Sequence, residues 1–438
     1  MGQVFAVGSW LGAYLALIVA PLFGLLLGDT PPPGGRWWDF GIALGFAGTT
    51  IMATQSALTA RFKRATVPYG IDVIYYFHRD LAVAGFVVIL AHPVLLVATN
   101  PPVLSLLDPR SAPWHMTAGI ASLIGFLALL VSSLARRSLR LEYDVWRRVH
   151  ALLALVAVGL ALVHIRGVGY YVAGPWKPFV WDGIGVLVLG TAVYVRLVRP
   201  VGLLRAPYRV ADVTQERGDS WTLALEPEGH RGFAFQPGQF AWVTLRHSPF
   251  AMREHPFSIS SSPSPSGRVE FTIKQLGDFT RTVGSIVAGE VAYVDGPYGA
   301  FSVDRYNTPG YCFIGGGIGL APLMSMLRAL ADRHDSRPLL LITANSRWDR
   351  VTFREAIHAL PSRLVLRIVH ILETPPAGWT GEVGWVDARL LDRHLPPHRR
   401  ELEYFVCGPT PMVEAVERAL HALDIPARRR HSELFDWA

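Results

Sequence analysis

Four histidines stand at matching intervals within two long apolar stretches of the chain. His78 and His92 are 14 positions apart, and His150 and His164 repeat that interval. On an α-helix, 14 residues advance about 1400°, roughly 40° short of four turns, and rise about 21 Å. Each pair therefore lies on one face of a helix, with one imidazole near each surface of a membrane. Polar side chains at such depths are costly, so they need a function.

The matching intervals predict two sites, each built from one histidine of each stretch. If both stretches cross the membrane in the same direction, His78 meets His150 on the inner side. His92 then meets His164 on the outer side. Imidazole is a common axial ligand of haem iron, and the chain contains no Cys-x-x-Cys-His attachment motif. The sequence therefore predicts two bis-histidine sites for two non-covalent b-type haems, stacked across the bilayer.

Other polar residues near these sites have simpler interpretations beside the functional one. Arg79, Arg147 and Arg148 flank the inner site and can pair with haem propionates. For any single membrane histidine, a structural role, hydrogen-bonded within the helix or facing a water cavity, is a better explanation than ligation. His115 has no partner at the 14-residue interval and keeps that structural interpretation, whereas the repeated interval favours ligation for the other four.

The elements that must position these histidines are membrane-spanning helices. Of the 438 residues, 51% are hydrophobic, and the apolar excess is confined to residues 1–200. A helix needs about 20 apolar residues to cross the hydrocarbon core, and this half contains six such segments. The first lacks a small-residue cleavage pattern, so we expect it to be retained. The expected spans are 4–28, 38–59, 72–98, 114–135, 147–165 and 179–198.

Basic residues are distributed unequally between alternate loops of this half. They gather after the second span, between the fourth and fifth, and after the sixth. Because cytoplasmic loops are enriched in Lys and Arg, both termini of this multi-pass protein are expected in the cytoplasm. The compactness of the chain and the absence of sorting signals favour a bacterial inner cell membrane. This topology accounts for most of the net charge of +7, so nucleic-acid binding is not expected. The enriched loops contain Arg61, Lys63, Arg64, Arg136, Arg137, Arg140, Arg147, Arg148, Arg196, Arg199 and Arg205, against Arg36, Arg110, Arg166 and Lys177 in the opposite loops.

The second half is predicted to form two domains with different strand patterns. Residues 206–302 alternate apolar and polar positions in short runs separated by Gly and Pro, which is typical of an antiparallel β-barrel. In residues 309–438, strands alternate with helices, which indicates a parallel α/β sheet. Cys312 and Cys407 are too few to hold an iron–sulfur cluster or to form a disulfide framework.

Two segments of this half can bind a flavin and a dinucleotide. Glycines between the first α/β strand and its helix, at 315–317 and 319, let the backbone approach a pyrophosphate; a tight turn alone is the alternative. In the barrel, residues 255–261 supply hydroxyls and amides that can bond an isoalloxazine ring, although a Ser-rich edge strand is the simpler interpretation. Arg281 can neutralise a flavin pyrophosphate.

These motifs closely resemble the ferredoxin-NADP reductase-like module of the ferric reductase and NADPH oxidase superfamily, and the paired histidines are similar to its haem ligands. The resemblance implies a six-helix transmembrane di-haem bundle (1–200) followed by a cytoplasmic module with an antiparallel FAD-binding β-barrel (206–302) and a parallel α/β NADP-binding domain (309–438). It also implies catalytic positions for Ser258, near the flavin, and Cys407, near the nicotinamide. The implied FAD residues are His255, Pro256, Phe257, Ser258, Ser260, Ser261, Gly277, Asp278, Thr280 and Arg281, and the implied nucleotide residues are Gly315, Gly316, Gly317, Gly319, Pro322, Cys407, Gly408 and Pro409.

Two details of cofactor binding are each open to a choice. Members of this superfamily often place a C-terminal aromatic ring over the flavin, and either Phe435 or Trp437 can take that place, since Ala438 departs from an aromatic last residue. The alternative is an apolar tail packed on the sheet. No acidic residue ends the second α/β strand, where it would favour the ribose hydroxyls of NADH. Ser346 and Arg347 stand there instead and suit the 2′-phosphate of NADPH.

The predicted cofactors are therefore FAD, two b-type haems and NADPH, with NADH as the alternative. The predicted activity is electron transfer from NADPH across the lipid bilayer to an extracytoplasmic acceptor. Dioxygen, giving superoxide, is the first candidate acceptor, and a ferric chelate is the second. The third candidate function is that of an electron-delivery subunit for a periplasmic protein, and the fourth is that of a membrane-anchored flavin reductase without haems. A protein partner is not required for the first two.

Overall fold

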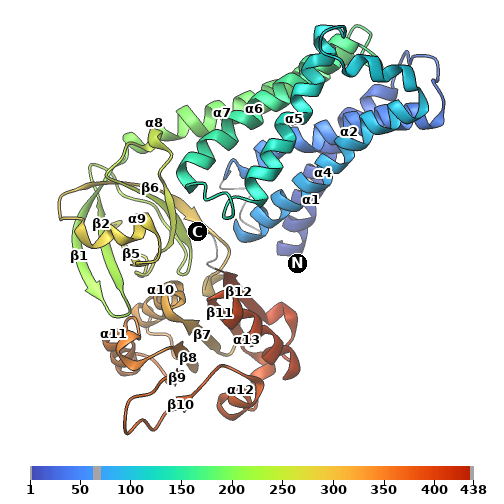
Figure 1. Cartoon of the computed structure of the whole chain (residues 1–438). Coiled ribbons are helices and arrows are strands. Elements are labelled where there is room, and N and C mark those ends of the chain that lie inside the picture. The colour runs from blue at the N-terminus through green and yellow to red at the C-terminus, as the bar shows by residue number, and fades with distance from the viewer. Residues whose placement is uncertain (1, 63–70, 435–438) are drawn as a thin grey trace. The chain divides into compact units, whose positions relative to one another are not determined.

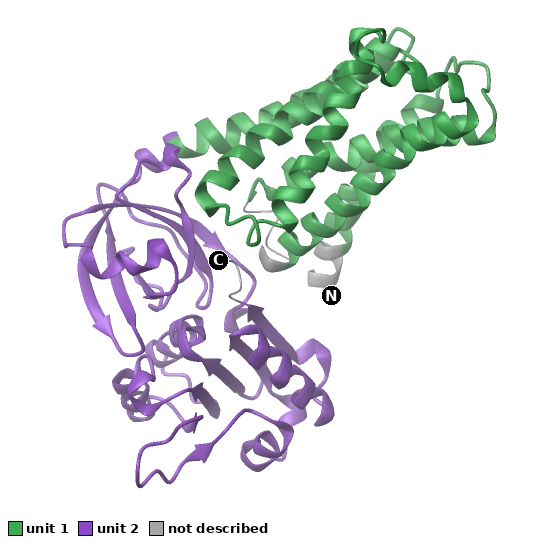
Figure 2. Ribbon diagram, viewed as in Figure 1, with its two compact units in different colours: residues 1–200 green, residues 201–438 purple. Residues whose placement is uncertain are grey.

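The computed structural model describes residues 2–62 and 71–434. The two expected flavin-stacking residues, Phe435 and Trp437, lie outside the described residues, as do Lys63 and Arg64 of a basic loop. The chain forms two compact units, Met1–Pro200 and Val201–Ala438, which Figure 2 shows in separate colours.

The first unit is a set of long helices (Figure 1). They fall at the positions expected from the apolar segments and, apart from the short α8, each runs for 17 to 29 residues between loops rich in Pro, Gly or Arg. The last one, α7, continues through a short π-helical turn, Tyr194–Val198, into α8. The helices are α1 (Gly2–Leu26), α2 (Arg36–Thr59), α4 (Ile71–Thr99), α5 (Trp114–Leu134), α6 (Tyr143–Val168), α7 (Lys177–Val193) and α8 (Arg199–Leu204).

Five segments of these helices are long and apolar enough to cross a membrane, judged over the described part of the chain. They are Gly8–Leu26, Val73–Thr99, Trp114–Leu134, Tyr143–Val168 and Lys177–Leu204. The sixth expected span, α2, is a helix of sufficient length, but it is more polar than the others. Its buried polar residues are Thr49, Thr50, Thr54 and Gln55.

Three of these side chains, Thr50, Thr54 and Gln55, form hydrogen bonds inside the unit, which explains how α2 can be both polar and buried. The Thr50 and Thr54 hydroxyls donate to carbonyls one turn back along the helix, those of Phe46 and Thr50. α2 packs along α4, and α5 packs along α6. Around them lies an apolar core in which Phe126 is 2% exposed and the rings of Phe46 and Trp181 are 4.9 Å apart.

The second unit begins with a six-stranded antiparallel sheet of order β4-β3-β6-β1-β2-β5. An isolated antiparallel bridge between Ile259 and Phe271 links the segment after β4 to β5 at the other end of that order. Buried apolar residues, among them Leu223 and Phe271, form its core. The strands are β1 (Tyr208–Glu216), β2 (Ser220–Pro227), β3 (Phe240–Leu245), β4 (His255–Ser258), β5 (Val269–Lys274) and β6 (Val291–Tyr298).

A second sheet follows, with six parallel strands in the order β10-β9-β8-β7-β11-β12. The parallel α/β pattern predicted from the sequence is present, with β10, β12 and α12 as additions to it. The strands are β7 (Tyr311–Gly316), β8 (Leu339–Asn345), β9 (Leu366–Leu372), β10 (Glu382–Val383), β11 (Glu403–Gly408) and β12 (Arg430–Leu434), and the helices are α10 (Leu320–Asp332), α11 (Arg354–Ala359), α12 (Ala388–His394) and α13 (Thr410–Ala422).

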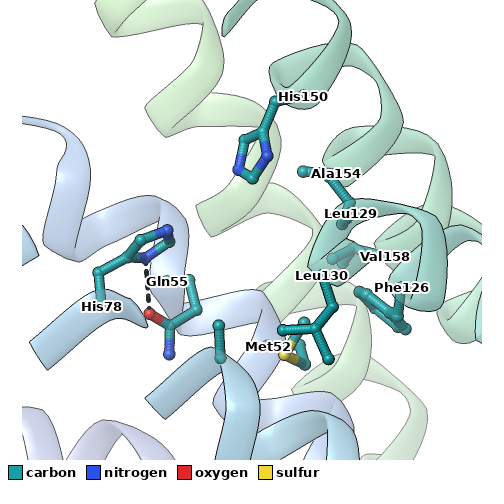
Figure 3. Close-up of a pocket in the computed structure, with 10 residues that line it drawn as sticks. Met52, Gln55, His78, Phe126, Leu129, Leu130, His150, Ala154 and Val158 are labelled. Carbon is teal, nitrogen blue, oxygen red and sulfur yellow. Dashed lines mark hydrogen bonds between the residues drawn. The ribbon is translucent and has the colours of Figure 1, made fainter. Parts of the chain in front are cut away.

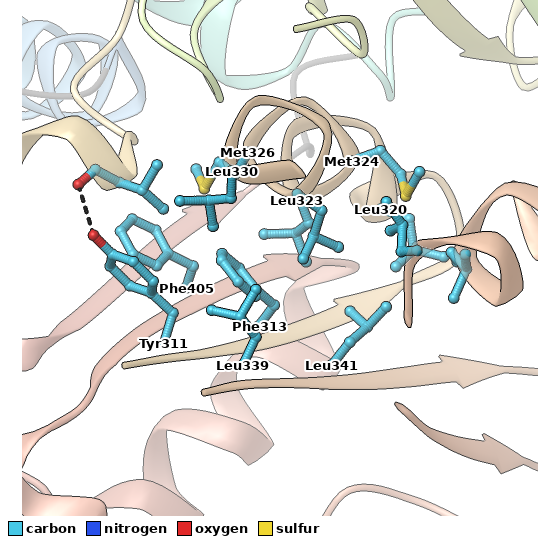
Figure 4. Packing of buried hydrophobic residues seen from close by; sticks show 14 of the residues in the cluster. Tyr311, Phe313, Leu320, Leu323, Met324, Met326, Leu330, Leu339, Leu341 and Phe405 are labelled. Carbon is cyan, nitrogen blue, oxygen red and sulfur yellow. Dashed lines mark hydrogen bonds between the residues drawn. The ribbon is translucent and has the colours of Figure 1, made fainter. Parts of the chain in front are cut away.

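Helices cover both faces of this sheet, so its strands are apolar on both sides. Figure 4 shows one face, where Leu323, Met326 and Leu330 of α10 lie over Phe313 and Phe405. A separate apolar cluster joins the other face to α12 and α13. Strand order reverses between β7 and β11, and ligands of such sheets bind beside the strand ends at that point.

Candidate redox cofactor sites

The two histidine pairs of the first unit meet as the 14-residue interval predicts. The ring centres of His78 and His150 are 6.5 Å apart, with planes inclined at 69°. Those of His92 and His164 are also 6.5 Å apart, inclined at 71°. The helices α4 and α6 therefore place two imidazole pairs of equal geometry along the bundle.

This spacing fits a metal held between two imidazoles. With metal–nitrogen bonds of about 2.0 Å and about 1.1 Å from nitrogen to ring centre, two axial imidazoles have centres about 6.2 Å apart. The observed 6.5 Å is close to that value. Among the described residues, no group of three or more His, Cys, Asp or Glu side chains forms a metal site. A two-histidine axial pair is thus the ligand set that the bundle offers.

A cavity lies between the inner pair, with about 460 Å³ of space free of protein atoms, part of it open to solvent. Figure 3 shows His78 and His150 at this cavity together with the apolar side chains of Phe126 and Leu130. An apolar lining with two imidazoles suits a flat, largely apolar macrocycle.

Every one of the four imidazoles uses Nδ1 for a bond to the protein. His92 Nδ1 lies 2.9 Å from the Gly41 carbonyl, and His164 Nδ1 lies 3.0 Å from the His115 carbonyl. Since a carbonyl oxygen only accepts, both Nδ1 atoms carry the proton. His78 Nδ1 lies 2.8 Å from Gln55 Oε1, and His150 Nδ1 lies 3.2 Å from Ser133 Oγ. Nε2 is therefore the nitrogen left for a metal.

The rings of the outer histidines lie against glycines of the neighbouring helices. A Cβ at Gly45 of α2 would come within 2.8 Å of His92 Nδ1. One at Gly119 of α5 would come within 2.7 Å of His164 Nδ1. Any larger residue would push the ring away, so glycine is required at both positions for close approach. Neither these glycines nor the Nδ1 partners were predicted from the sequence. The polar residue Gln55 within a hydrophobic segment was the feature that could have indicated a hydrogen-bond partner for a histidine.

The arginines expected near the inner site have protein partners. Arg79 pairs with Asp80 at 2.9 Å, Arg148 donates to the Asp144 carbonyl at 3.2 Å, and Arg147 lies over the Tyr143 ring. The ring of His115, the unpaired histidine, lies against Gly167, where an added Cβ would come within 2.3 Å of His115 Cβ.

In the barrel, β4 brings the two predicted flavin segments together. The His255 ring stacks on Phe279 of the Gly277–Arg281 segment, with centres 4.0 Å apart and planes inclined at 19°. Ser258 ends the strand with a side chain that is 6% exposed, and its Oγ has no hydrogen-bond partner among the described residues. A buried hydroxyl without a partner costs free energy, so Ser258 fits a site completed by a bound group. Arg281 is exposed.

The other hydroxyls that were predicted to bind the flavin form hydrogen bonds within the protein. Ser260 Oγ lies 2.9 Å from Thr272 Oγ1, and Ser261 Oγ accepts from the Glu270 amide at 3.1 Å. Thr280 Oγ1 accepts from the Gly277 amide at 2.8 Å and so shapes the turn before α9 (Asp278–Arg281). Of these side chains, Ser258 alone is left without a protein partner in the described structure.

The glycine loop and the Cys-Gly-Pro segment meet where strand order reverses. Gly315 and Gly316 end β7, and Gly317 to Gly319 follow it. Cys407 and Gly408 end β11, which pairs with β7, and Pro409 follows. A Cβ at Gly319 would come within 2.3 Å of the Cys407 carbonyl oxygen, so only glycine permits this contact. Pro322 is buried in the first turn of α10. The residues predicted to bind the dinucleotide thus lie together at the edge of the sheet, as that prediction requires.

Three further residues define the end of β8 beside this loop. Asn345 is buried, and its Nδ2 has no hydrogen-bond partner among the described residues, which leaves a donor for a ribose or phosphate. Ser346 and Arg347 are exposed. Arg347 makes a double hydrogen bond to Asp349, at 2.9 and 2.7 Å, and this guanidinium holds the pKa of the Asp349 carboxyl below its usual value.

Helix α10 connects the nucleotide loop to the flavin strand, a link that was not predicted from the sequence. Ser325 Oγ donates to the Ser261 carbonyl at 2.6 Å and accepts from the Gly238 amide at 3.2 Å. One turn on, Arg328 Nη1 donates to the Ser260 carbonyl at 2.9 Å. Cys407 is fully buried within the apolar cluster on the same face of the sheet. Ser325 and Arg328 are three residues apart and so lie on one face of the helix, and this spacing could have indicated the link from the sequence.

Comparison with known families identifies three domains in this chain. The FAD-binding domain matches residues 207–302, and the oxidoreductase NAD-binding domain matches residues 313–418. These are the flavin and nicotinamide domains of an oxidoreductase. The ferric reductase like transmembrane component matches residues 44–161, which include His78, His92 and His150. The chain therefore has the ferric reductase/NADPH oxidase-like architecture.

Individual relatives match part of this chain. NADH-cytochrome b5 reductase 1 of Laccaria bicolor is 33% identical over 182 residues, 40% of this chain and 59% of that protein. The glycine betaine monooxygenase reductase subunit of Pseudomonas aeruginosa is 32% identical over 235 residues, 52% of this chain and 63% of that protein. The chain thus spans less than two thirds of these curated relatives. A solved structure, the ferredoxin reductase in carbazole 1,9a-dioxygenase, matches at 25% identity and a TM-score of 0.46 over 52% of this chain and 69% of that chain.

Proposed function

We propose that this protein is a membrane flavocytochrome that moves electrons from NADPH, through FAD and two b-type haems, to dioxygen on the far side of the membrane. The observation that carries the proposal is the pair of equal imidazole geometries, each with ring centres 6.5 Å apart. If two imidazoles hold each haem, the haems would supply single-electron transfer, and dioxygen that accepts one electron would become superoxide.

The residues of the bundle have defined roles in this proposal. His78 and His150 hold the inner haem through Nε2, and His92 and His164 hold the outer one. The Nδ1 bonds fix the orientation and tautomer of each ring. When bound, the haems carry single electrons across the apolar core. We infer six membrane spans, with α2 as the most polar, because α2 supplies partners to both His78 and His92.

In the second unit, the chain binds and aligns the two cofactors of hydride transfer. Ser258 Oγ is a buried hydroxyl free to bond the flavin ring, and Arg281 is an exposed cation placed to neutralise its pyrophosphate. The glycine loop after β7 receives the dinucleotide phosphates. Cys407 and Pro409 border the nicotinamide pocket, and Ser325 holds α10 against the flavin strand. FAD, when bound, accepts a hydride and passes on electrons one at a time.

The unequal distribution of basic residues supports a topology with both termini and the cofactor-binding unit in the cytoplasm. Arg61, Arg136, Arg137 and Arg140 fall in one set of alternate loops, whereas Arg36, Arg110 and Arg166 fall in the other set. With this orientation, His92 and His164 form the extracytoplasmic site.

The test is NADPH-driven reduction of cytochrome c by detergent-purified, FAD-supplemented protein in air, with and without superoxide dismutase. The bis-histidine haem spectrum is recorded first. We expect most of the rate to be sensitive to dismutase and to be lost in the His92→Leu variant. A reduced haem spectrum with little superoxide would overturn dioxygen as the acceptor. Absence of haem would overturn the proposal as a whole.

A ferric chelate is the second candidate acceptor, favoured by the match to the ferric reductase like transmembrane component. Under argon, ferric citrate with ferrozine reports Fe²⁺ formation directly. Faster reduction of the chelate than of dioxygen, at equal electron supply, would select this function.

A further inference from the structure

The two histidine pairs differ in the chemistry of their Nδ1 partners. At the outer pair both partners are main-chain carbonyls, of Gly41 and His115. At the inner pair both are side chains, Gln55 of α2 and Ser133 of α5. The same two helices, α2 and α5, supply both sets. Substitution can therefore alter the inner bonds, whereas the outer ones belong to the backbone.

Gln55 is oriented as an acceptor. Its Nε2 donates to the Ile51 carbonyl at 3.2 Å, which turns Oε1 toward His78 at 2.8 Å. The side chain is buried, with 6% of its surface exposed. An amide oxygen in such a place accepts a strong bond from Nδ1–H, because water does not compete for it.

Ser133 is also fixed as an acceptor. Its hydroxyl donates to the Leu129 carbonyl at 2.6 Å, so its single proton is used there. The hydroxyl oxygen then accepts from His150 Nδ1–H at 3.2 Å. The neighbouring Ser132 also donates to the Leu129 carbonyl, at 3.2 Å, but has no bond to a histidine among the described residues.

We propose that Gln55 and Ser133 are positioning residues that set the reduction potential of the inner haem, acting through His78 and His150. This inference rests on the proposed function, since it requires a haem between those histidines. An acceptor at Nδ1–H shifts electron density toward Nε2, which makes the ligand more basic and stabilises ferric iron. Removing either acceptor makes the inner haem easier to reduce and leaves the outer haem unchanged.

The experiment is a spectroscopic redox titration of the full-length protein, which yields a midpoint potential for each haem. Gln55→Met keeps the length and removes the acceptor, and Ser133→Ala removes the second acceptor. We expect each variant to shift one of the two midpoints to a more positive value. The affected midpoint is the one lost in His78→Leu. Ser133→Thr retains the hydroxyl and should restore the wild-type value, and the matched control Ser132→Ala should not change it.

The outcomes separate this inference from the proposed function. If both haems are bound in Gln55→Met and Ser133→Ala and neither midpoint moves, the inference is wrong and the haem sites stand. Equal shifts of both midpoints, or a shift in Ser132→Ala, indicate a general change in packing and also overturn it. Gln55→Met changes α2 and Ser133→Ala changes α5. If one of these variants loses haem, the other variant still tests the inference. If the wild-type protein binds no haem, the proposed function fails.

Discussion

His92 and His164, which are 72 positions apart in the chain, face each other with ring centres 6.5 Å apart, and each donates from Nδ1 to a backbone carbonyl. The carbonyls belong to Gly41 of α2 and His115 of α5. Four residues after each accepting carbonyl comes the glycine against which the ring lies, Gly45 or Gly119. This repeated arrangement makes the outer pair the most constrained of the predicted ligand sets.

Replacing one outer histidine should remove one haem. In His92→Leu the opposing His164 cannot hold an iron alone as a six-coordinate site, so haem content per protein should fall by half. The inner haem should keep its absorption, and electron flow to the acceptor should be lost. Pyridine haemochrome analysis measures the content. His115→Gln is the control, since the backbone carbonyl of residue 115 accepts from His164 whatever its side chain. Unchanged haem content in His92→Leu would refute ligation by His92.

A single methyl group beside the outer site should have a similar effect. In Gly119→Ala the new Cβ lies within 2.7 Å of His164 Nδ1, so the ring must move and the bond to the His115 carbonyl must break. We expect loss or weakening of outer haem binding, seen as a lower haem-to-protein ratio. Gly159→Ala on α6 meets nothing within 4 Å and should bind both haems. Equal haem content in the two variants would contradict this account.

Removal of the unpartnered Ser258 hydroxyl should slow flavin reduction. One lost hydrogen bond of about 1.4 kcal/mol in the transition state corresponds to about tenfold in rate. Anaerobic stopped-flow mixing of Ser258→Ala with NADPH, followed by flavin absorbance, gives that rate. Ser262→Ala serves as the control because Ser262 Oγ donates to Asp332 Oδ2, away from Ser258. A wild-type rate in Ser258→Ala would exclude a role for the hydroxyl.

The Asp349 carboxylate should weaken preference for NADPH. It holds the Arg347 guanidinium through two bonds and offers a negative charge near the expected 2′-phosphate. In Asp349→Asn the guanidinium is released, so the ratio of kcat/KM for NADPH over NADH should rise several-fold. Asp392→Asn, which disrupts a pair with Arg399 in the same domain, controls for net charge. If the ratio stays constant, Arg347 does not contact that phosphate.

Stability of the second unit should fall in mild acid because of His370. Burial lowers the pKa of His370 to about 4, with His358 and Arg354 adding to the effect. Between pH 6.5 and about 4 the unfolded chain binds a proton that the folded state does not, so stability decreases as pH falls. The loss is about 3 kcal/mol at most. Thermal melts of His370→Gln should show a smaller decrease over this window than the wild type; parallel curves would contradict the assignment.

Much of the fold could be predicted from local patterns in the sequence. The 14-residue interval placed each histidine pair on one helix face, because helical geometry is fixed by the backbone. The change from alternating strands to strand–helix repeats identified the antiparallel and parallel sheets. β10 and β12 were missed because a two-residue edge strand and a strand near the chain end have little hydrophobic pattern of their own.

What the sequence by itself determined was therefore the type and order of the elements and the identity of the facing histidines. Only the tertiary structure decided which atoms complete each site. Gln55 reaches His78 across 23 positions, Ser325 reaches Ser261 across 64, and the Cys407 carbonyl lies against Gly319 from a different strand. Such contacts depend on how close two backbones approach and which polar group has no other partner. Periodicity along one chain segment carries no information about either, because both arise from packing between segments distant in sequence.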